Sequence, residues 1–207
     1  MSEKHIHPNE PSPASLSSLE NPNLATEDPE WLQQIVEVQA EQMQGRQRRI
    51  SAKIKIPATA EQIWAVLTDY EALPDFIPNL SKSKRLERPN GGLRLEQIGT
   101  QRLLKLNFSA RVVLDMEEEF PSEIRFNMVE GDFKAFSGHW RLEPQPIALS
   151  ETSDTGHAQP ITDLLYSLEV CPKLTMPVKF IEHRICKDLR FNLFAIRQKL
   201  VGIPATV

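Results

Sequence analysis

The first clear pattern in the chain is an alternation of apolar and polar residues over 50–56, followed by a helical pattern over 60–67. The period of two predicts a half-buried strand that ends at Pro57. Thr59 is a predicted N-cap, and Gln62, three residues later, completes a capping box. Positions 60, 63, 64 and 67 then share an apolar helix face, and a second short helix is predicted over 70–77, before Pro78.

The period of two returns after Leu80 and predicts six more strands. The patterns lie over 81–87, 93–97, 106–116, 124–128, 140–142 and 164–170. The longest apolar face runs from Leu106 to Met116. Residues 89–92, Pro-Asn-Gly-Gly, predict a hairpin turn, and the proline-rich stretch 144–160 predicts a long loop.

The C-terminal segment from Val178 to Leu200 changes to a helical period, and Gly202 is the expected end of that helix. Its apolar stripe comprises positions 181, 185, 189, 193, 196 and 200. Glu182 lies off this stripe, so its replacement by alanine is expected to be silent. The pattern as a whole predicts an α+β fold. In it, a curved antiparallel sheet of about seven strands wraps around a long C-terminal helix, and two short helices follow the first strand.

The N-terminal part of the chain differs in composition. Residues 1–27 are polar and rich in proline, which predicts disorder. Residues 28–30 have the composition of a helix start, and the spacing of Trp31, Ile35 and Val38 predicts a helix to Gln44, ended by Gly45. We therefore expect a disordered tail (1–27), a short helix and linker (28–47) and one domain (48–202). The basic residues 46, 48 and 49 are expected to be solvated.

Composition excludes several classes of protein. The 207 residues carry a formal net charge of −4, which gives no support to a nucleic-acid partner. Cys171 and Cys186 lack the spacing of a metal site and are expected to be free thiols in a reducing, cytoplasmic protein. No apolar run is long enough to span a bilayer, and no secretory signal is visible. We expect neither a metal nor a cofactor.

Four segments resemble the START-like helix-grip superfamily, also called SRPBCC. They are 63–70, 73–78, 132–140 with its Gly-x-Trp pattern, and 165–170 followed by two prolines and the terminal helix. The resemblance covers residues from Arg48 to Leu200 and is closest to the polyketide cyclase/dehydrase branch, which includes the coenzyme Q-binding protein and ribosome-associating toxins. It implies a helix-grip fold with a hydrophobic cavity. None of the four segments is a catalytic signature, and one fold hosts many functions.

The residues on the inward faces of the strands and on the helix stripe are the predicted lining of that cavity. They are Leu93, Leu95, Gln97, Leu106, Phe108, Ala110, Val112, Leu114, Met116, Phe126, Trp140, Tyr166, Ile185 and Leu189. Gln97 and Tyr166 are candidates for hydrogen bonds to a ligand carbonyl, whereas Trp64 and Trp140 are expected to serve as core aromatics. The apolar residues 73, 76, 77 and 80 border the expected cavity mouth, where they either pack onto the sheet or contact a membrane transiently.

The leading hypothesis is a protein that binds or transports a lipophilic small molecule, such as an isoprenoid quinone or another lipid. A cyclase or dehydratase is the first alternative, with Glu118, Tyr166 or His139 as acid or base. By alternation Glu118 shares the face of Leu114 and Met116, either within the cavity or at its rim. The second alternative is a regulatory interaction module. We assign no catalytic residue, because no catalytic motif occurs in the chain.

Overall fold

The computed structural model describes residues 29–88, 91–103, 106–146 and 160–202. The expected disordered tail and most of the expected 144–160 loop lie outside these ranges. The helices are α1 (Glu30–Ile35), α2 (Ala60–Thr68), the 3-10 helix η3 (Leu73–Asp75) and α3 (Val178–Val201). The strands are β1 (Val36–Gln42), β2 (Arg48–Ile56), β3 (Leu80–Leu86), β4 (Leu93–Leu103), β5 (Leu106–Glu119), β6 (Glu123–Gly131), β7 (Ala135–Pro144) and β8 (Thr162–Cys171).

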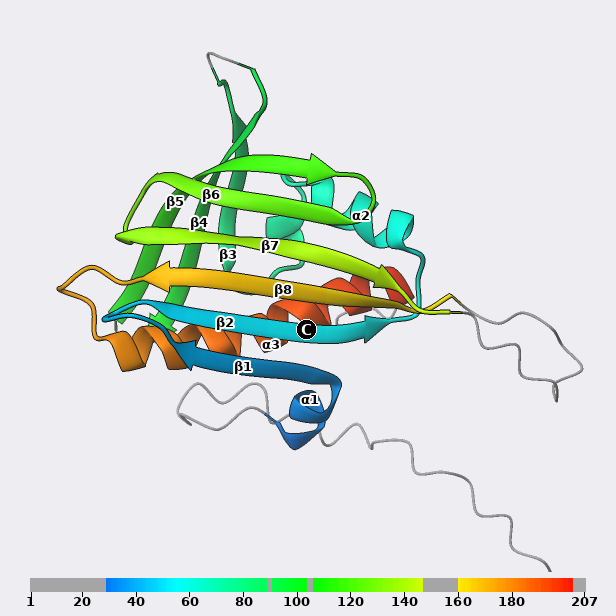
Figure 1. The fold of residues 1–207 in the computed structure, drawn as a ribbon, viewed down its shortest axis with the longest axis horizontal. Helices are drawn as coiled ribbons and strands as arrows, with labels where there is room; N and C mark the ends of the chain where they lie inside the picture. Colours follow the sequence, from blue (N-terminus) through cyan, green and yellow to red (C-terminus); the bar gives the residue numbers. More distant parts are fainter. Residues whose placement is uncertain (1–28, 89–90, 104–105, 147–159, 203–207) are drawn as a thin grey trace, which may run out of the picture.

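All eight strands form one antiparallel sheet in the order β1-β2-β8-β7-β6-β5-β4-β3. The sheet is strongly curved, so that β3, β4 and β5 stand at a steep angle to β1 and β2 (Figure 1). The long helix α3 crosses one face of this sheet (Figure 1). The α+β helix-grip architecture predicted from the sequence is therefore confirmed, with one strand more than expected.

The apolar stripe of α3 packs against the sheet as its spacing predicts. Ile181, Leu189, Leu193 and Ile196 are buried, and α3 contacts β1, β2 and α2. Gly202 ends the helix with a φ of 71°, a left-handed conformation that glycine adopts at little cost. None of the helices in the described part of the chain is both long and apolar enough to cross a membrane.

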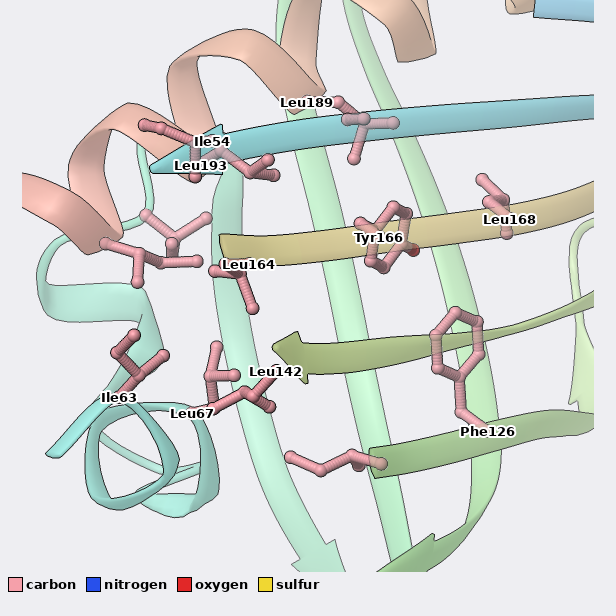
Figure 2. Packing of buried hydrophobic residues seen from close by; sticks show 14 of the residues in the cluster. Ile54, Ile63, Leu67, Phe126, Leu142, Leu164, Tyr166, Leu168, Leu189 and Leu193 are labelled. Carbon is pink, nitrogen blue, oxygen red and sulfur yellow. The ribbon is translucent and has the colours of Figure 1, made fainter. Parts of the chain in front are cut away.

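Helix α2 begins with the predicted capping box. The Thr59 backbone N–H donates to Gln62 Oε1 at 2.9 Å, and the Gln62 N–H donates to Thr59 Oγ1 at 3.3 Å. Ile63 and Leu67 of α2 join the core that fills the space between helices and sheet, near Leu142 and Leu164 (Figure 2). The capping box therefore fixes where α2 begins, and its apolar face closes one end of the sheet.

The prediction of a helix from Trp31 to Gln44 is wrong for most of that range. Only the short α1 is helical, and β1 follows it directly, paired with β2 from Val36 opposite Ile54 to Gln42 opposite Arg48. Leu32 and Val36 are fully buried, and the Trp31 ring meets Phe194 of α3 edge-on at 5.0 Å. The sequence of 36–42 fits a strand as well as a helix, because it also alternates with a period of two. Pairing with the open edge of β2 selects the strand. Gly45, expected to end a helix, takes a left-handed φ of 61° in the hairpin between β1 and β2.

The arginines at the start of β2 bind groups of the protein, and of the three only Arg48 is buried, whereas the Arg49 side chain stays 40% exposed. Arg46 donates to the carbonyls of Lys173 and Met176, and Arg49 pairs with Glu169 at 2.7 Å. Arg48 is buried, and its Nε lies 2.5 Å from Glu182 Oε2 on α3. The expectation that Glu182 is dispensable is therefore wrong, because its carboxylate neutralises a buried guanidinium.

Replacing Glu182 by alanine should destabilise the fold by about 2 kcal/mol, since Arg48 would keep its bonds to two backbone carbonyls but lose its counter-charge. Urea unfolding of the single variants and of Arg48→Met/Glu182→Ala would measure the coupling between the two residues. His183→Ala, at the exposed neighbouring position, is the control. Additive effects of the two substitutions would contradict the ion pair.

Candidate functional site: a cavity beneath the gripping helix

A partly open cavity of about 260 Å³ lies between the concave face of the sheet and α3. The predicted residues on its wall are Gln97, Ala110, Val112, Leu114, Met116, Phe126, Trp140, Tyr166, Ile185 and Leu189. The other described residues on the wall are Leu67, Tyr70, Leu73, Ile77, Asn79, Leu80, Gly99, Ile124, Phe133, Phe136, Leu168, Asp188, Asn192 and Ile196. Most of these side chains are apolar. Figure 2 shows Phe126, Tyr166 and Leu168 on the sheet and Leu189 on α3.

Two described residues of the predicted lining, Leu93 and Leu95, are not on this wall. Leu95 is fully buried and Leu93 is partly buried, and both pack in the core beside the cavity. They share the inward face with Leu114 and Met116, their partners across β4 and β5. The side chains of Leu106 and Phe108 lie outside the described part of the chain.

Aromatic rings form much of the wall on the side of the sheet. The Tyr166 ring lies 4.2 Å from that of Trp140 and 5.8 Å from that of Phe126, measured between centroids. Phe133 and Phe136 stack at 5.4 Å nearby. These contacts hold the rings in place, so this wall is a rigid apolar surface rather than a set of loose side chains.

The Tyr166 hydroxyl is the polar group at the centre of this aromatic wall. Burial raises the pKa of its phenol above the ordinary value. It is therefore a neutral donor at physiological pH, and its O–H can be offered to a group inside the cavity.

The remaining polar groups gather where β3, β4 and α3 meet. Asn79 Nδ2 donates to Asp188 Oδ1 at 2.9 Å, and Arg184 lies 3.6 Å from the same oxygen. Gln97 Nε2 donates to Ser83 Oγ at 3.2 Å, so this amide of the wall already has a partner within the protein. Asn192 stands one helical turn after Asp188 on the same face of α3. We call Asn79, Asp188 and Asn192 the polar corner of the cavity.

Sequence reasoning did not include the polar corner. Asp188 and Asn192 are polar residues at the edge of an apolar stripe, a position that normally faces solvent. The spacing of Ile185, Asp188, Leu189 and Asn192 places them on one helix face, and this is the signal that could have revealed them. Asn79 follows Pro78 in a connection whose path the sequence does not define.

The residues expected at the cavity mouth pack onto the protein. Leu73, Ile77 and Leu80 line the cavity, and Ile77 is buried. The Phe76 ring is partly buried against the core beneath the ammonium of Lys199, which lies 5.6 Å from its centroid. The packing alternative of the sequence analysis is therefore the one that the structure favours at this segment.

The candidate acids and bases Glu118 and His139 do not lie on the cavity wall. Glu118 is exposed near the end of β5, where its Oε1 accepts a hydrogen bond of 2.6 Å from the Tyr70 hydroxyl. His139 points to the outer face of the sheet, opposite Trp140, and burial lowers the pKa of its imidazole. No group of three or more His, Cys, Asp or Glu side chains in the described ranges is placed to hold a metal ion.

A family model described as polyketide cyclase / dehydrase and lipid transport matches residues 56–194. The chain belongs to this family. Among proteins of similar sequence is the ribosome association toxin RatA of Escherichia coli, which is 27% identical over 96 residues, or 46% of this chain. That match spans 58% of the toxin's own length.

Solved structures with the same fold as this cyclase/dehydrase and lipid transport family member are more distant in sequence. A STAR-related lipid transfer protein from Xanthomonas axonopodis is 17% identical, with a TM-score of 0.60 over 85% of this chain and 97% of that one. The Zhui aromatase/cyclase of a Streptomyces is 16% identical, with a TM-score of 0.51 over 75% of this chain and 92% of that one. At these identities the likeness shows the fold alone.

The two tyrosines of the chain provide a direct test of this cavity wall. Burial, and for Tyr70 also its bond to Glu118, raises both pKa values in the folded protein. The absorbance of tyrosinate should therefore stay absent as the pH passes about 10, the pKa in an unfolded chain. Because only the unfolded state then loses these protons, the free energy of unfolding should fall as the pH rises above about 10. Tyr70→Phe and Tyr166→Phe identify each contribution, and a normal titration of either tyrosine would contradict its burial.

Proposed function

We propose that the protein binds a lipophilic small molecule in this cavity and transports it, with an isoprenoid quinone or another lipid as the cargo. The observation that carries the proposal is the composition of the wall: rigid aromatic and aliphatic side chains surround the space, and the polar groups are few and lie in defined places. Ligand sites for small molecules have this character. Removal of apolar ligand surface from water would provide most of the affinity, at about 25 cal/mol per Å² before ordering costs.

The size of the cavity limits how much of a long lipid it encloses. Its 260 Å³ lies just below the range of about 300–1,000 Å³ that is common for sites of drug-sized ligands. A head group or a short section of chain fits inside. The rest of a long isoprenoid tail would extend through the opening or require the wall to move.

The placement of titratable groups favours binding over catalysis. An acid–base enzyme needs two such groups that converge on the substrate. In the described wall, the titratable residues are Tyr70, Tyr166 and Asp188; both tyrosines are kept neutral by burial, and Asp188 is engaged by Asn79 and Arg184. Glu118 and His139, the candidates of the enzyme alternative, face elsewhere.

Ala110→Phe tests the carrier function, because it places a ring in the middle of the β5 wall. In an open cavity the ring is accommodated, so the thermal midpoint should change by a few degrees at most while uptake of a fluorescent quinone or lipid analogue falls. Ser109→Phe, on the exposed outer face of the same strand, is the matched control. In a filled core the same substitution overpacks, at a cost of about 1–3 kcal/mol. A destabilised variant together with a wild type that takes up no probe would contradict the proposal and favour a regulatory interaction module.

We further propose a cytoplasmic protein that contacts membranes transiently to load its cargo. Cys171 and Cys186 form no disulfide, as is usual in a reducing compartment. The segment between β8 and α3 exposes Leu174 at 87%, and the first turn of α3 exposes Phe180 at 37%. The neighbouring Lys173 and Lys179 are exposed as well. Apolar side chains beside cations suit the surface of an anionic membrane.

Leu174→Asp should reduce co-sedimentation with vesicles that contain phosphatidylserine, because it adds a negative charge and removes the most exposed apolar side chain of this segment. Thr175→Asp, the same charge at the exposed next position, separates the loss of apolar contact from charge repulsion. Equal sedimentation of Leu174→Asp and wild type would exclude this contact.

A further inference from the structure

The side of α3 that faces away from the sheet carries a second row of apolar side chains. Positions at intervals of four and three lie on one side of a helix. On the side away from the buried stripe they are Phe180, Arg184, Lys187, Phe191, Phe194 and Gln198. We call these six residues the outer face. Half of them are phenylalanine, although the side of a helix that faces away from the core is normally polar.

The outer face is also part of a basic helix. In all, α3 contains six lysines and arginines and two acidic residues, a formal net charge of +4. Both acids already have cationic partners, because Glu182 pairs with Arg48 and Asp188 lies 3.6 Å from Arg184. Arg184 and Lys187 place two of the cations among the phenylalanines. A surface of this kind fits a segment that combines acidic and apolar side chains.

A segment with this chemistry precedes the described part of the chain. Residues 1–28 carry five acidic side chains and one lysine, a formal net charge of −4 that is opposite to the charge of α3. The part nearest the domain, 16–28, contains three acids and three leucines, namely Glu20, Glu27, Asp28, Leu16, Leu19 and Leu24. Its composition predicts no core of its own, so it can bury these leucines only against another surface.

The point at which this segment joins the domain lies beside the outer face. Pro29 is the first described residue, and the Trp31 ring meets Phe194 edge-on at 5.0 Å. Trp31 is 41% exposed and Phe180 is 37% exposed, so apolar surface remains at both ends of the face. At about 1.5 Å of rise per residue the helix covers about 21 Å from Phe194 to Phe180, which about six or seven extended residues can follow. The tether therefore gives the segment an effective concentration on the order of millimolar at this face.

We propose that residues 16–28 dock on the outer face of α3, with their acids against its cations and their leucines against its phenylalanines. The α3 residues that line the cavity belong to the other side of the helix; they are Ile185, Asp188, Leu189, Asn192 and Ile196. The inference therefore does not depend on the cargo of the cavity. Phe180 belongs both to the outer face and to the surface proposed above for membrane contact, so docking and that contact exclude each other at this residue.

Carbodiimide coupling of the full chain tests the docking, because this zero-length reagent joins a carboxylate to a lysine only where the two are in contact. Peptide mapping should find links from the acids of 16–28 to Lys187. Their yield should exceed that of links to Lys84, which is exposed on the edge strand β3, by at least about tenfold, because docking raises the local concentration. Raising NaCl from about 0.1 M to 1 M should remove most of the links to Lys187, since the Debye length falls from about 10 Å to about 3 Å.

Reversal of charge on each side identifies the partners. Glu20→Lys/Glu27→Lys should repel the segment from α3 and so also weaken the link from Asp28 to Lys187. Adding Lys187→Glu to this variant should restore docking, visible as links in the reverse sense, between the introduced amines and the introduced carboxylate. Unchanged thermal midpoints would show that each variant stays folded.

Phe180→Ser tests the apolar half of the surface and should reduce the yield of links to Lys187. Val129→Ser, at an exposed position of β6, is the matched control and should leave the yield unchanged. Mixing light and heavy isotope-labelled chains separates links within one chain from links to a second copy. Equal yields at Lys84 and Lys187, links formed only between chains, or a charge swap that restores nothing would each overturn the proposal. Absence of any link to Lys187 would leave the outer face to a partner outside the chain and would overturn it as well.

Discussion

Burial of one apolar stripe of α3 against the curved sheet is the interaction on which the rest of the structure depends. Leu189, Leu193 and Ile196 lie in the core, and the helix contacts β1 and β2 most extensively. The bend of the sheet turns β4 and β5 to a steep angle with β1 and β2, as Figure 1 shows. The same face of α3 that seals the core on one side therefore leaves a space on the other. The cavity is a geometric result of gripping a straight helix with a bent sheet, and its chemistry comes from the residues at the edge of the stripe.

The fold could be predicted because its elements have strong, local signals. Spacing alone specifies most of the elements. The apolar stripe at 181–200 predicts α3, the capping box at Thr59 predicts the start of α2, and each alternating segment predicts a strand. The edge strand β1 could not be predicted in this way, since Trp31, Ile35 and Val38 fit a helix while Val36, Val38 and Ala40 fit a strand. The open edge of β2 selects the strand, and that edge is a property of the assembled sheet. Burial of Arg48 was missed for the same reason, because its partner Glu182 lies on a distant element.

The site was predictable where it is built from regular strands and unpredictable at its polar positions. Alternation along β5 places Ala110, Val112 and Leu114 on the cavity wall. The same alternation extends to Glu118, but β5 continues beyond the cavity, so that this carboxylate emerges at the surface and binds Tyr70 instead. Periodicity identifies the face of a strand on which a residue lies. It does not identify the point along the strand at which the cavity ends.

The order of the strands has a consequence for how the chain folds. Within the sheet, β2 near the start of the domain pairs with β8 near its end, and the side-chain bond of Arg49 to Glu169 there spans 120 residues. Contacts of such sequence separation are associated with slow folding. During synthesis, a chain that ends before β8 has β2 and β7 as unpaired edges, and α3 is not yet available to cover the apolar face between them. The nascent protein therefore exposes aggregation-prone surface until its last quarter is complete.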